Sequence, residues 1–240
     1  MSLSALESVT YCQRYKRANI HTIGCNFKCK GCSYKLIKKE SRGKILSAEE
    51  VKSALKTLDI KRVHFVGGEP TICEDIASIA KFCHEEINVR TKIGHSTGIN
   101  MPPENIDEMH ITIKAFSDDI HREYTGVSNS KVLSNFKKIY DQGIFLSAST
   151  VFIPELVDIE EIEKIAKFIA GVDPAIPFHI TGYIPVPGTP WRSPYQSEMI
   201  KAKQIAGRYL EKVTTSRFQS IDDYNNMIKQ NPSYQSVSVL

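Results

Sequence analysis

Three cysteines stand close together in the segment Cys25-Asn-Phe-Lys-Cys29-Lys-Gly-Cys32. One short loop can therefore present three thiolates, and each of them can reach a different iron of a cubane [4Fe-4S] cluster. The fourth iron then has no protein ligand and can bind a small bidentate molecule, as an open zinc site binds its substrate. The spacing predicts a [4Fe-4S] cluster with one open iron.

Structural zinc is the alternative metal for these cysteines, with His21 or Cys12 as the fourth ligand. Zinc sites usually combine two Cys-x-x-Cys units or add two histidines downstream, and the chain has neither pattern. The remaining cysteines, Cys12, Cys73 and Cys83, are expected to be small, buried apolar residues. Clustered cysteines of this kind favour a metal site over a set of disulfides.

A second motif, Gly67-Gly68-Glu69-Pro70, follows the third cysteine by 35 residues. Glycines allow the backbone to come very close to a ligand, and Glu69 offers an acceptor for a cationic group. An ordinary turn is the alternative. Further along the chain, Lys114 lies inside an apolar run, where a cation is costly unless an anion faces it.

Helices and strands around these motifs must hold them in position. The chain alternates β-branched runs with longer amphipathic stretches about six times, which favours parallel βα units and an α/β fold. Strands are expected at residues 18–24, 62–66, 89–95, 109–115, 144–152 and 178–183. Helices are expected at residues 47–58, 73–86, 131–141, 158–171 and 196–210, with capping boxes from Ser47 to Glu50 and from Asp158 to Glu161. The cysteines then follow the first strand, and the glycines end the second.

The 240 residues contain 41% hydrophobic side chains, enough for the core of one domain over residues 1–240. We expect a core at about residues 18–190, a basic N-terminal segment at residues 1–17, and a C-terminal helix and tail at residues 195–240. No apolar run approaches the roughly 20 residues that span a bilayer, and the first residues lack the features of a secretion signal. The cytoplasm is therefore the expected location.

Positive charge is concentrated around the cysteines, because residues 1–44 hold ten Lys or Arg against two Glu, within a net charge of +4. This segment is either a solvated face or a docking patch for an acidic redox protein or an anionic substrate. Binding to nucleic acid has less support, since the segment has few aromatic residues for stacking and no known RNA- or DNA-binding motif.

The cysteine loop and the glycine-rich turn resemble those of the radical S-adenosylmethionine (SAM) superfamily, and in particular of compact proteins similar to pyruvate formate-lyase activating enzymes. Further segments resemble the fourth and fifth strands of the activating enzymes: residues 113–116, His121, residues 125–129 and residues 151–154. The likeness covers roughly residues 19–190. It implies a partial (β/α)6 TIM-like barrel with its cofactors at the carboxyl ends of the strands.

The resemblance also implies roles in cofactor binding. Cys25, Cys29 and Cys32 would bind the [4Fe-4S] cluster. The implied SAM-binding residues are Tyr34, Gly67, Gly68, Glu69, Ser96, Thr97, Lys114, Ser149 and His179. Among them, the glycines would let the backbone approach the methionine end of SAM, Glu69 would accept from its ammonium group, and Ser96 and Thr97 would bond its ribose or carboxylate.

Lys114, His179, Tyr183 and His121 also have ordinary alternatives. Lys114 would face a carboxylate of SAM or of the substrate, or else form a buried salt bridge. His179 and Tyr183 share one face of an ideal strand near the expected adenine site, and core packing would equally explain them. His121 is expected in a polar loop, where it would touch substrate, order the loop or remain solvated.

The chain also departs from the pattern of the activating enzymes. Gly31 stands where the family often has an aromatic residue, although Tyr34 is close enough in sequence to shield the adenine instead. Ser149 replaces a common arginine, and Ile184 replaces a common histidine. These changes leave the cluster motif intact and weaken the case for a glycyl radical enzyme as the substrate.

The resemblance predicts an anaerobic enzyme that cleaves SAM reductively and uses the 5′-deoxyadenosyl radical to abstract hydrogen. Its expected substrate is a glycyl radical enzyme, and its expected electron donor is ferredoxin or flavodoxin. A small molecule, a peptide or another protein is the alternative substrate. Outside enzymes, a metal-binding module without catalysis is the remaining alternative.

Overall fold

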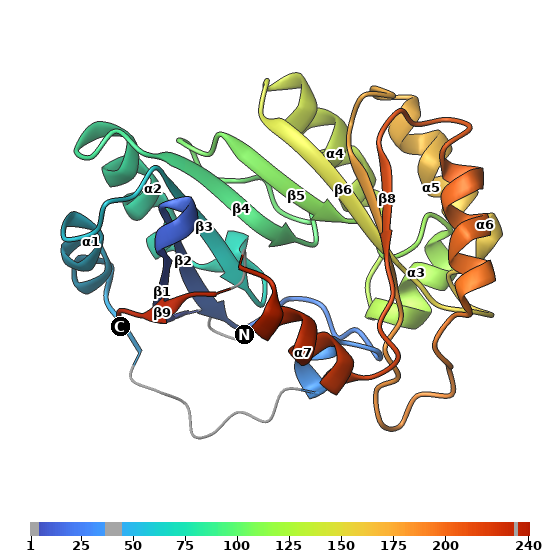
Figure 1. Ribbon diagram of the computed structural model, residues 1–240. Helices are drawn as coiled ribbons and strands as arrows, with labels where there is room; N and C mark the ends of the chain where they lie inside the picture. Colours follow the sequence, from blue (N-terminus) through green and yellow to red (C-terminus); the bar gives the residue numbers. More distant parts are fainter. Residues whose placement is uncertain (1–4, 37–44, 233–234) are drawn as a thin grey trace.

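A curved sheet with helices along its outer face forms the framework of the protein (Figure 1). The computed structural model describes residues 5–36, 45–232 and 235–240. Within these ranges the strands form one sheet in the order β8-β7-β6-β5-β4-β3-β2-β1-β9. The fold is α/β, and the predicted partial barrel of the TIM-like type is confirmed.

Seven neighbouring strands of this sheet are parallel, from β2 to β8. They are β2 Arg17–Ile23, β3 Arg62–Gly67, β4 Arg90–Ser96, β5 Glu108–Thr112, β6 Phe145–Phe152, β7 Phe178–Gly182 and β8 Val213–Ser216. The strand β1 Ala5–Cys12 pairs with β2 in antiparallel fashion, and β9 Val237–Ser238 pairs with β1 in the same way. All six strands predicted from the sequence are present.

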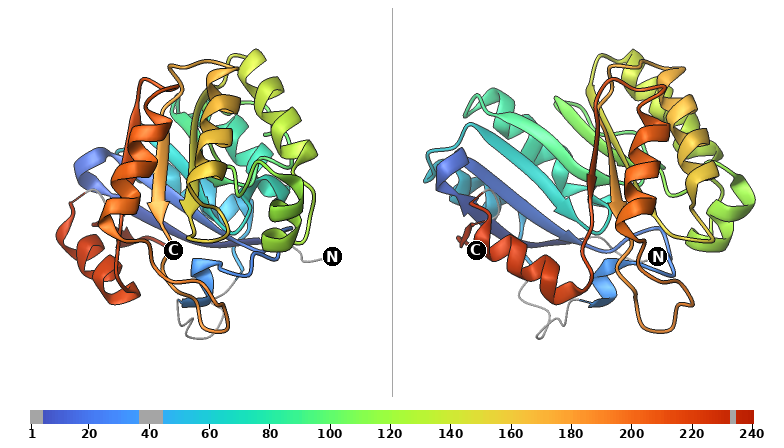
Figure 2. Two further views of the ribbon diagram at one scale, coloured as in Figure 1. Left: turned by 90° about the vertical axis from the view of Figure 1, so that its right-hand side faces the viewer. Right: turned by 45° about the vertical axis from the view of Figure 1, so that its right-hand side comes forward.

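Helices cover the outer face of the sheet, as the side views show (Figure 2). They are α1 Ala48–Lys56, α2 Asp75–Glu85, α4 Ser130–Asp141, α5 Ile159–Ala170 and α6 Gln196–Ala206. The helix α3 Asp118–Thr125 lies at the carboxyl ends of the strands, and the short 3₁₀ helices are η1 Gln13–Tyr15, η2 Ser33–Leu36 and η3 Pro70–Ile72. No helix among the described residues is long and apolar enough to cross a membrane.

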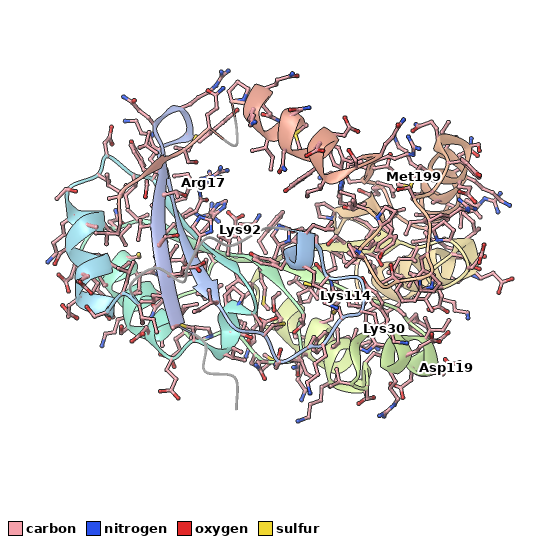
Figure 3. The ribbon with its side chains drawn as sticks, turned by 90° about the horizontal axis from the view of Figure 1, so that it is seen from below. Arg17, Lys30, Lys92, Lys114, Asp119 and Met199 are labelled. Atoms are coloured by element: carbon pink, nitrogen blue, oxygen red, sulfur yellow. The ribbon has the colours of Figure 1, made fainter. Side chains whose placement is uncertain are left out.

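The C-terminal segment runs from one edge of the sheet to the other. After β8, the helix α7 Ile221–Gln230 leads to β9, which pairs with β1 at the opposite edge. Seen along the barrel, α7 lies across the open side of the half barrel (Figure 3). Part of the expected C-terminal tail therefore forms a helix and a strand.

Strand alternation explains why the helices pack where they do. Outward-facing side chains such as Ile20, Phe65, Ile93 and Ile111 are fully buried beneath the helices. Successive side chains of a strand point to opposite faces, so the residues between them face the concave side. The apolar face fixes the sheet against the helices and leaves the concave face for other functions.

Several elements were not predicted, among them β1, β8 and α7. Residues 5–12 of the expected basic segment form β1, whose pairing shifts between Leu6 and Ser8, so its buried residues do not alternate regularly. The strand β8 is four residues long and rich in threonine, and α7 contributes no buried residue. Without a clear apolar period, none of these segments could be recognised from the sequence.

One of the two predicted capping boxes is confirmed. The Ser47 hydroxyl accepts from the backbone N–H of Glu50 at 3.2 Å, and the Glu50 carboxylate accepts from the N–H of Ser47 at 2.9 Å. The second prediction is wrong, because Asp158 caps α5 by accepting from the N–H of Glu160. Glu161 instead turns into the protein and is 1% exposed.

Glu161 ties α5 to the loop that precedes α3. Its carboxylate accepts from the backbone N–H groups of Phe116 at 2.9 Å and Ser117 at 3.0 Å, and it pairs with Lys164 at 2.8 Å. Burial alone would raise the pKa of Glu161, but the bonds from Lys164, Ser117 and Phe116 outweigh this and hold the pKa below its ordinary value.

We expect Glu161→Ala to lower the free energy of unfolding by about 2–4 kcal/mol, because two buried N–H groups lose their acceptor. The matched change Glu160→Ala, at an exposed position one residue earlier, should alter it by less than about 0.5 kcal/mol. Urea unfolding at pH 7 measures both. Since the folded-state pKa of Glu161 is lowered, its contribution should disappear as the pH falls through that pKa. Equal stability of the two variants at pH 7 would contradict this role.

Candidate cluster and cofactor site

The three predicted cluster ligands lie on the loop that follows β2. Cys25, Cys29 and Cys32 are partly buried free thiols. Burial raises the pKa of Cys25 and of Cys29; the N–H of Phe27 opposes this at Cys25, and the positive charge of Lys114 opposes it at Cys29. Metal ligation needs the thiolate form, so a cationic cluster would displace these protons.

The same loop does not form a site for a single ion. Nowhere in the described ranges do three His, Cys, Asp or Glu side chains converge closely enough to hold one metal. Cys12 pairs with Arg17 at the far end of β2, about 20 Å from the loop by strand length, and His21 contacts Thr10. The zinc alternative thus lacks its fourth ligand, whereas three thiols spread along one loop fit a four-iron cluster.

The other cysteines are core residues, as predicted. Cys12, Cys73 and Cys83 are 1%, 5% and 0% exposed. Cys12 is the last residue of β1, Cys73 directly follows η3, and Cys83 lies in α2.

The glycine-rich turn after β3 is held directly against the start of the cysteine loop. The N–H of Gly68 donates to the carbonyl of Thr22 at 3.0 Å, and the N–H of Glu69 donates to the carbonyl of Gly24 at 2.9 Å. A Cβ on Gly68 would lie 1.9 Å from the Gly24 oxygen, and one on Gly67 would lie 2.0 Å from the Thr22 oxygen. The glycines are therefore required because backbone passes backbone at this point, whatever ligand the turn binds.

Glu69 is enclosed by hydrogen-bond donors from two strands' ends. It is 0% exposed, and Oε1 accepts from the hydroxyls of Thr71 at 2.6 Å and Ser96 at 2.9 Å. Oε2 accepts from the N–H of Thr97 at 2.5 Å. The structure thus brings together three of the predicted residues, Glu69, Ser96 and Thr97. Glu69 forms no ion pair with any residue in the described ranges, so its charge has no counter-ion from the chain.

Lys114 lies just beyond the end of β5, near the cysteine loop (Figure 3). It forms no ion pair with a described residue, so the buried salt bridge suggested by its sequence context is absent from that part of the chain. Its charge acts on Cys29, where it opposes the rise in thiol pKa that burial causes. A buried anion at Glu69 and a partly buried cation at Lys114 therefore both lie near the cysteine loop.

The C-terminus of α3 is hydrogen-bonded to the middle of the cysteine loop. The carbonyl of Thr125 accepts from the N–H of Lys28 at 3.0 Å, and the carbonyl of Tyr124 accepts from the N–H of Lys30 at 2.9 Å. The last carbonyls of a helix have no partners within it, so they are available for such contacts. The loop is consequently fixed both at its start and at its middle.

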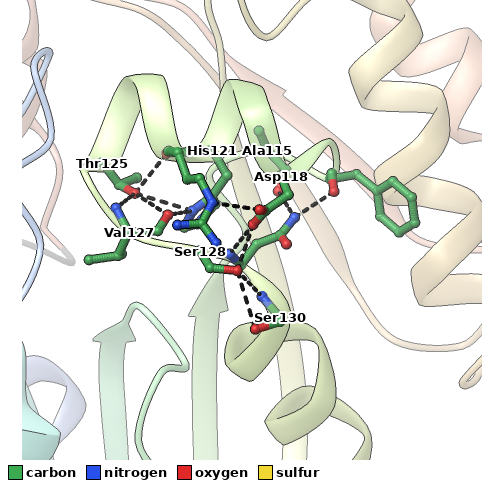
Figure 4. Close-up of polar contacts among 10 residues, drawn as sticks. Ala115, Asp118, His121, Thr125, Val127, Ser128 and Ser130 are labelled. Atoms are coloured by element: carbon green, nitrogen blue, oxygen red, sulfur yellow. Dashed lines mark hydrogen bonds and ion pairs between the residues drawn. The ribbon is translucent and has the colours of Figure 1, made fainter.

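His121 was predicted in a polar loop, and that prediction is wrong. It lies in α3, is 0% exposed, and its ring meets that of Phe27 edge-on at 5.5 Å. Its Nδ1 donates to the carbonyl of Val127 at 2.8 Å, and burial lowers its pKa (Figure 4). His121 therefore packs against Phe27 of the cysteine loop and ties α3 to the turn that follows it.

The turn after α3 is held by a second set of contacts in the same network (Figure 4). Asp118 accepts from the hydroxyl of Ser128 at 2.6 Å and from the N–H of Asn129 at 2.9 Å, and it pairs with Arg122 at 2.6 Å. These bonds lower the pKa of Asp118 to about 2. The segment that resembles the activating enzymes thus has a structural function in this chain: it holds α3 in place against the loop.

Comparison with known proteins shows which family has this arrangement of cysteine loop and glycine-rich turn. The model of the radical SAM superfamily matches residues 19–169. A Methanocaldococcus jannaschii protein named as a glycyl-radical enzyme activating enzyme is 35% identical over 205 residues, which cover 81% of this chain and 78% of the relative. The chain belongs to the radical SAM superfamily.

Solved structures share the fold of this radical SAM protein. A radical SAM methyltransferase from Sphaerobacter thermophilus matches with a TM-score of 0.64 at 16% identity, over 86% of this chain and 68% of that one. A domain of a pyruvate-formate lyase-activating enzyme from Bacteroides vulgatus matches with a TM-score of 0.53 at 22% identity, over 64% of this chain and 98% of that one.

Two tyrosines fill the space that Gly31 leaves in this radical SAM loop. A Cβ on Gly31 would lie 2.7 Å from the ring of Tyr183 and 3.1 Å from the hydroxyl of Tyr124. Both tyrosines are 2% exposed and pack edge-on against Trp191. Tyr34, predicted to take the place of the missing aromatic residue, lies in η2 and is 43% exposed. No local pattern predicts this exchange, because the tyrosines come from distant parts of the chain.

Ser149 and His179 lie opposite each other on β6 and β7. The Ser149 hydroxyl contacts His110 at 2.8 Å, and His179 contacts Thr214 at 2.8 Å and Ser216 at 2.9 Å. These two predicted residues belong to a polar lining of the concave face. No contact between them and Glu69 is present in the described part of the chain, and their role in binding SAM stays a prediction.

We expect Gly68→Ala to prevent the turn from docking on Gly24, because the added Cβ would overlap a backbone oxygen. The variant should retain less than about half of the iron that the parent protein binds after anaerobic reconstitution, since the loop start is no longer fixed. Gly171→Ala, at a helix end where a Cβ meets its nearest atom at 3.4 Å, is the control and should retain full iron. Full iron in Gly68→Ala would show that the docking is not needed.

Proposed function

We propose that this radical SAM protein is an enzyme that binds a [4Fe-4S] cluster through Cys25, Cys29 and Cys32 and binds SAM beside it. One observation supports the SAM site above all, namely the fully buried Glu69, which has no counter-ion among the described residues. A buried carboxylate is costly without a paired charge. The ammonium group of SAM would supply that charge, and Lys114 would complement its carboxylate.

The backbone contacts set the distance between the two binding groups. The N–H of Glu69 donates to the carbonyl of Gly24, the residue directly before Cys25, so the backbone of Glu69 is fixed beside the first proposed cluster ligand. Cys25, Cys29 and Cys32 would hold the cluster, whose chemistry would be to supply one electron for reductive cleavage of a C–S bond of SAM. The chain's part is to orient SAM at the open iron and to hold the substrate close enough for hydrogen abstraction.

The electron would come from ferredoxin or flavodoxin, in anaerobic cytoplasm. Lys30 lies on the cysteine loop with 53% of its side chain exposed, and Lys35 follows in η2. Such positive charges beside the cluster suit an acidic redox protein. This partner and this location rest on the sequence pattern and on the proposed chemistry.

A glycyl radical enzyme is the first candidate substrate. The relative from M. jannaschii, 35% identical, is named for this activity, and the segment from Lys114 to Asn129 resembles that of activating enzymes. In such a reaction the radical would remove hydrogen from a glycine that a loop of the partner protein carries into the half barrel.

A small molecule is the second candidate substrate, and the concave face favours it. Imidazole and hydroxyl groups line this face across neighbouring strands, among them His110 with Ser147 and Ser149. Ordered polar side chains of this kind suit a ligand with several polar groups of its own. A metal-binding module without catalysis would need neither this lining nor a buried Glu69.

We expect Cys29→Ala to lose the cluster and with it all reductive cleavage of SAM, because two thiolates cannot hold four irons in place. Cys83→Ala, which removes a buried sulfur of α2, should keep both iron and cleavage. Iron analysis and the yield of 5′-deoxyadenosine under dithionite measure the two effects. Stoichiometric zinc, with no thiolate-to-iron charge-transfer absorption after anaerobic reconstitution, would instead support the non-catalytic module.

The two candidate substrates differ in one spectroscopic outcome. If a glycyl radical enzyme is the substrate, incubating the reduced protein with SAM and a candidate partner should produce a glycyl radical, seen as a doublet in electron paramagnetic resonance. A partner whose glycine is replaced by alanine is the control. Formation of 5′-deoxyadenosine without that doublet would reject activation of this partner and leave the cleavage of SAM intact.

A further inference from the structure

The last part of the chain forms a strap between the two edges of the sheet. It leaves the sheet after β8, crosses the open side as α7 and returns at β9, which pairs with β1. We call residues 217–240, of which the structure describes 217–232 and 235–240, the C-terminal strap. The strand arrows in Figure 1 point toward the side where α7 lies, so the strap spans the end of the half barrel that carries the cysteine loop.

The two ends of the strap are attached to the sheet unequally. At one end, all four residues of β8 pair with β7, and Nε of Arg217 donates to the carbonyl of Pro194 at 2.6 Å. At the other end, β9 is two residues long and both are exposed, and the N–H of Val9 donates to the carbonyl of Leu240 at 3.1 Å. The short, exposed pairing is the weaker attachment, so the strap can detach at β9 while β8 serves as its hinge.

Helix α7, in the middle of the strap, is held by little buried surface. Its apolar side chains share one face of the helix, and none of them is fully buried: Ile221, Tyr224, Met227 and Ile228. A helix of ten residues is marginal on its own in water. Elements with so little buried apolar surface open at a low cost in free energy.

Aromatic residues place the strap near the cluster ligands. Within the strap, the rings of Phe218 and Tyr224 pack edge-on at 5.2 Å. Burial raises the pKa of the Tyr34 phenol to about 12, and Cys32, Glu7 and Tyr224 each add to this rise. Tyr34 is therefore within electrostatic range of both the cysteine loop and α7. The apolar face of α7 thus has an aromatic partner beside the cofactor site.

We propose that the C-terminal strap is a lid over the cofactor site, hinged at β8 and released at β9, which closes when SAM is bound. The proposal rests on the proposed function, because SAM is the ligand that the lid would retain. In the closed position, the half-buried apolar face of α7 would pack toward Tyr34 and the adenosyl group. These added contacts favour the closed state, since a ligand shifts an equilibrium by its differential contacts with the two states.

A lid of this kind has a use in the proposed chemistry. The sheet ends at β8 and β9 in the part of the chain that the structure describes, so pairing of these strands does not close its open side. A carbon radical must be kept from water and from hydrogen donors other than the substrate. Lids that close over a bound ligand supply this protection and open again for release. The strap is the element that spans the open side.

Hydrogen exchange of the anaerobically reconstituted protein, with and without SAM, tests the lid. Without SAM, the amides of α7 should exchange at least about 100-fold faster than those of α6, a surface helix of similar length that buries Met199, Ala202 and Ala206. Saturating SAM should slow exchange in α7 at least about tenfold and leave α6 unchanged. Exchange in α7 as slow as in α6 without SAM, or no slowing by SAM, would overturn the proposal.

SAM binding to the same samples, measured by equilibrium dialysis, separates this proposal from the proposed function. Binding of SAM without slower exchange in α7 rejects the lid alone. A protein that assembles its cluster but binds no SAM rejects the proposed function, and the lid with it.

A reversible lock tests whether the strap opens at β9. Thr10 and Ser238 are opposite each other in the antiparallel pair, where Cα atoms are about 4.5–5.5 Å apart, so cysteines at both positions can form a disulfide. The double variant Thr10→Cys and Ser238→Cys, once oxidised, should take up radiolabelled SAM at least about tenfold more slowly than the same protein after reduction with a phosphine. Ser238→Cys alone is the control and should respond to neither treatment. Equal rates in the locked and reduced double variant would overturn the release at β9.

Discussion

Two backbone hydrogen bonds between the turn after β3 and the end of β2 determine the geometry of the site. They join Gly68 to Thr22 and Glu69 to Gly24, at 3.0 Å and 2.9 Å. Only glycine fits at Gly67 and Gly68, because any Cβ would overlap a carbonyl oxygen. The cysteine loop and the buried carboxylate are therefore parts of one rigid unit, and parallel pairing of β2 with β3 sets the position of both.

This unit also explains why the rest of the carboxyl end is built as it is. Helix α3 holds the middle of the cysteine loop through the carbonyls of Tyr124 and Thr125, and His121 and Asp118 hold α3. Loops on a barrel rim are usually its most mobile part. Here contacts from the turn after β3 and from α3 restrain the loop, so the three thiols and Glu69 can keep fixed positions before any cofactor binds, which lowers the cost of binding it.

The sequence was sufficient to predict what short-range patterns encode. The six parallel strands have clear apolar runs, and the cysteine and glycine motifs lie at strand ends, where a parallel sheet brings them together. Contacts between residues far apart in the chain could not be predicted from the sequence. The strand β1 has an irregular pairing, and His121 is buried by contacts with Phe27. The space beside Gly31 is filled by two tyrosines about 90 and 150 residues away in the chain. Such features depend on partners that no local pattern identifies.

The pairing of Glu69 with the ammonium group of SAM is most directly tested by equilibrium binding of SAM to the reconstituted protein and to Glu69→Gln. A SAM analogue without the amino group serves as the second ligand. The parent should bind SAM about 10-fold to 100-fold more tightly than Glu69→Gln does, and the two proteins should bind the analogue equally. If Glu69→Gln bound SAM as tightly as the parent, or lost SAM and the analogue to the same extent, Glu69 would not be the partner of the ammonium group.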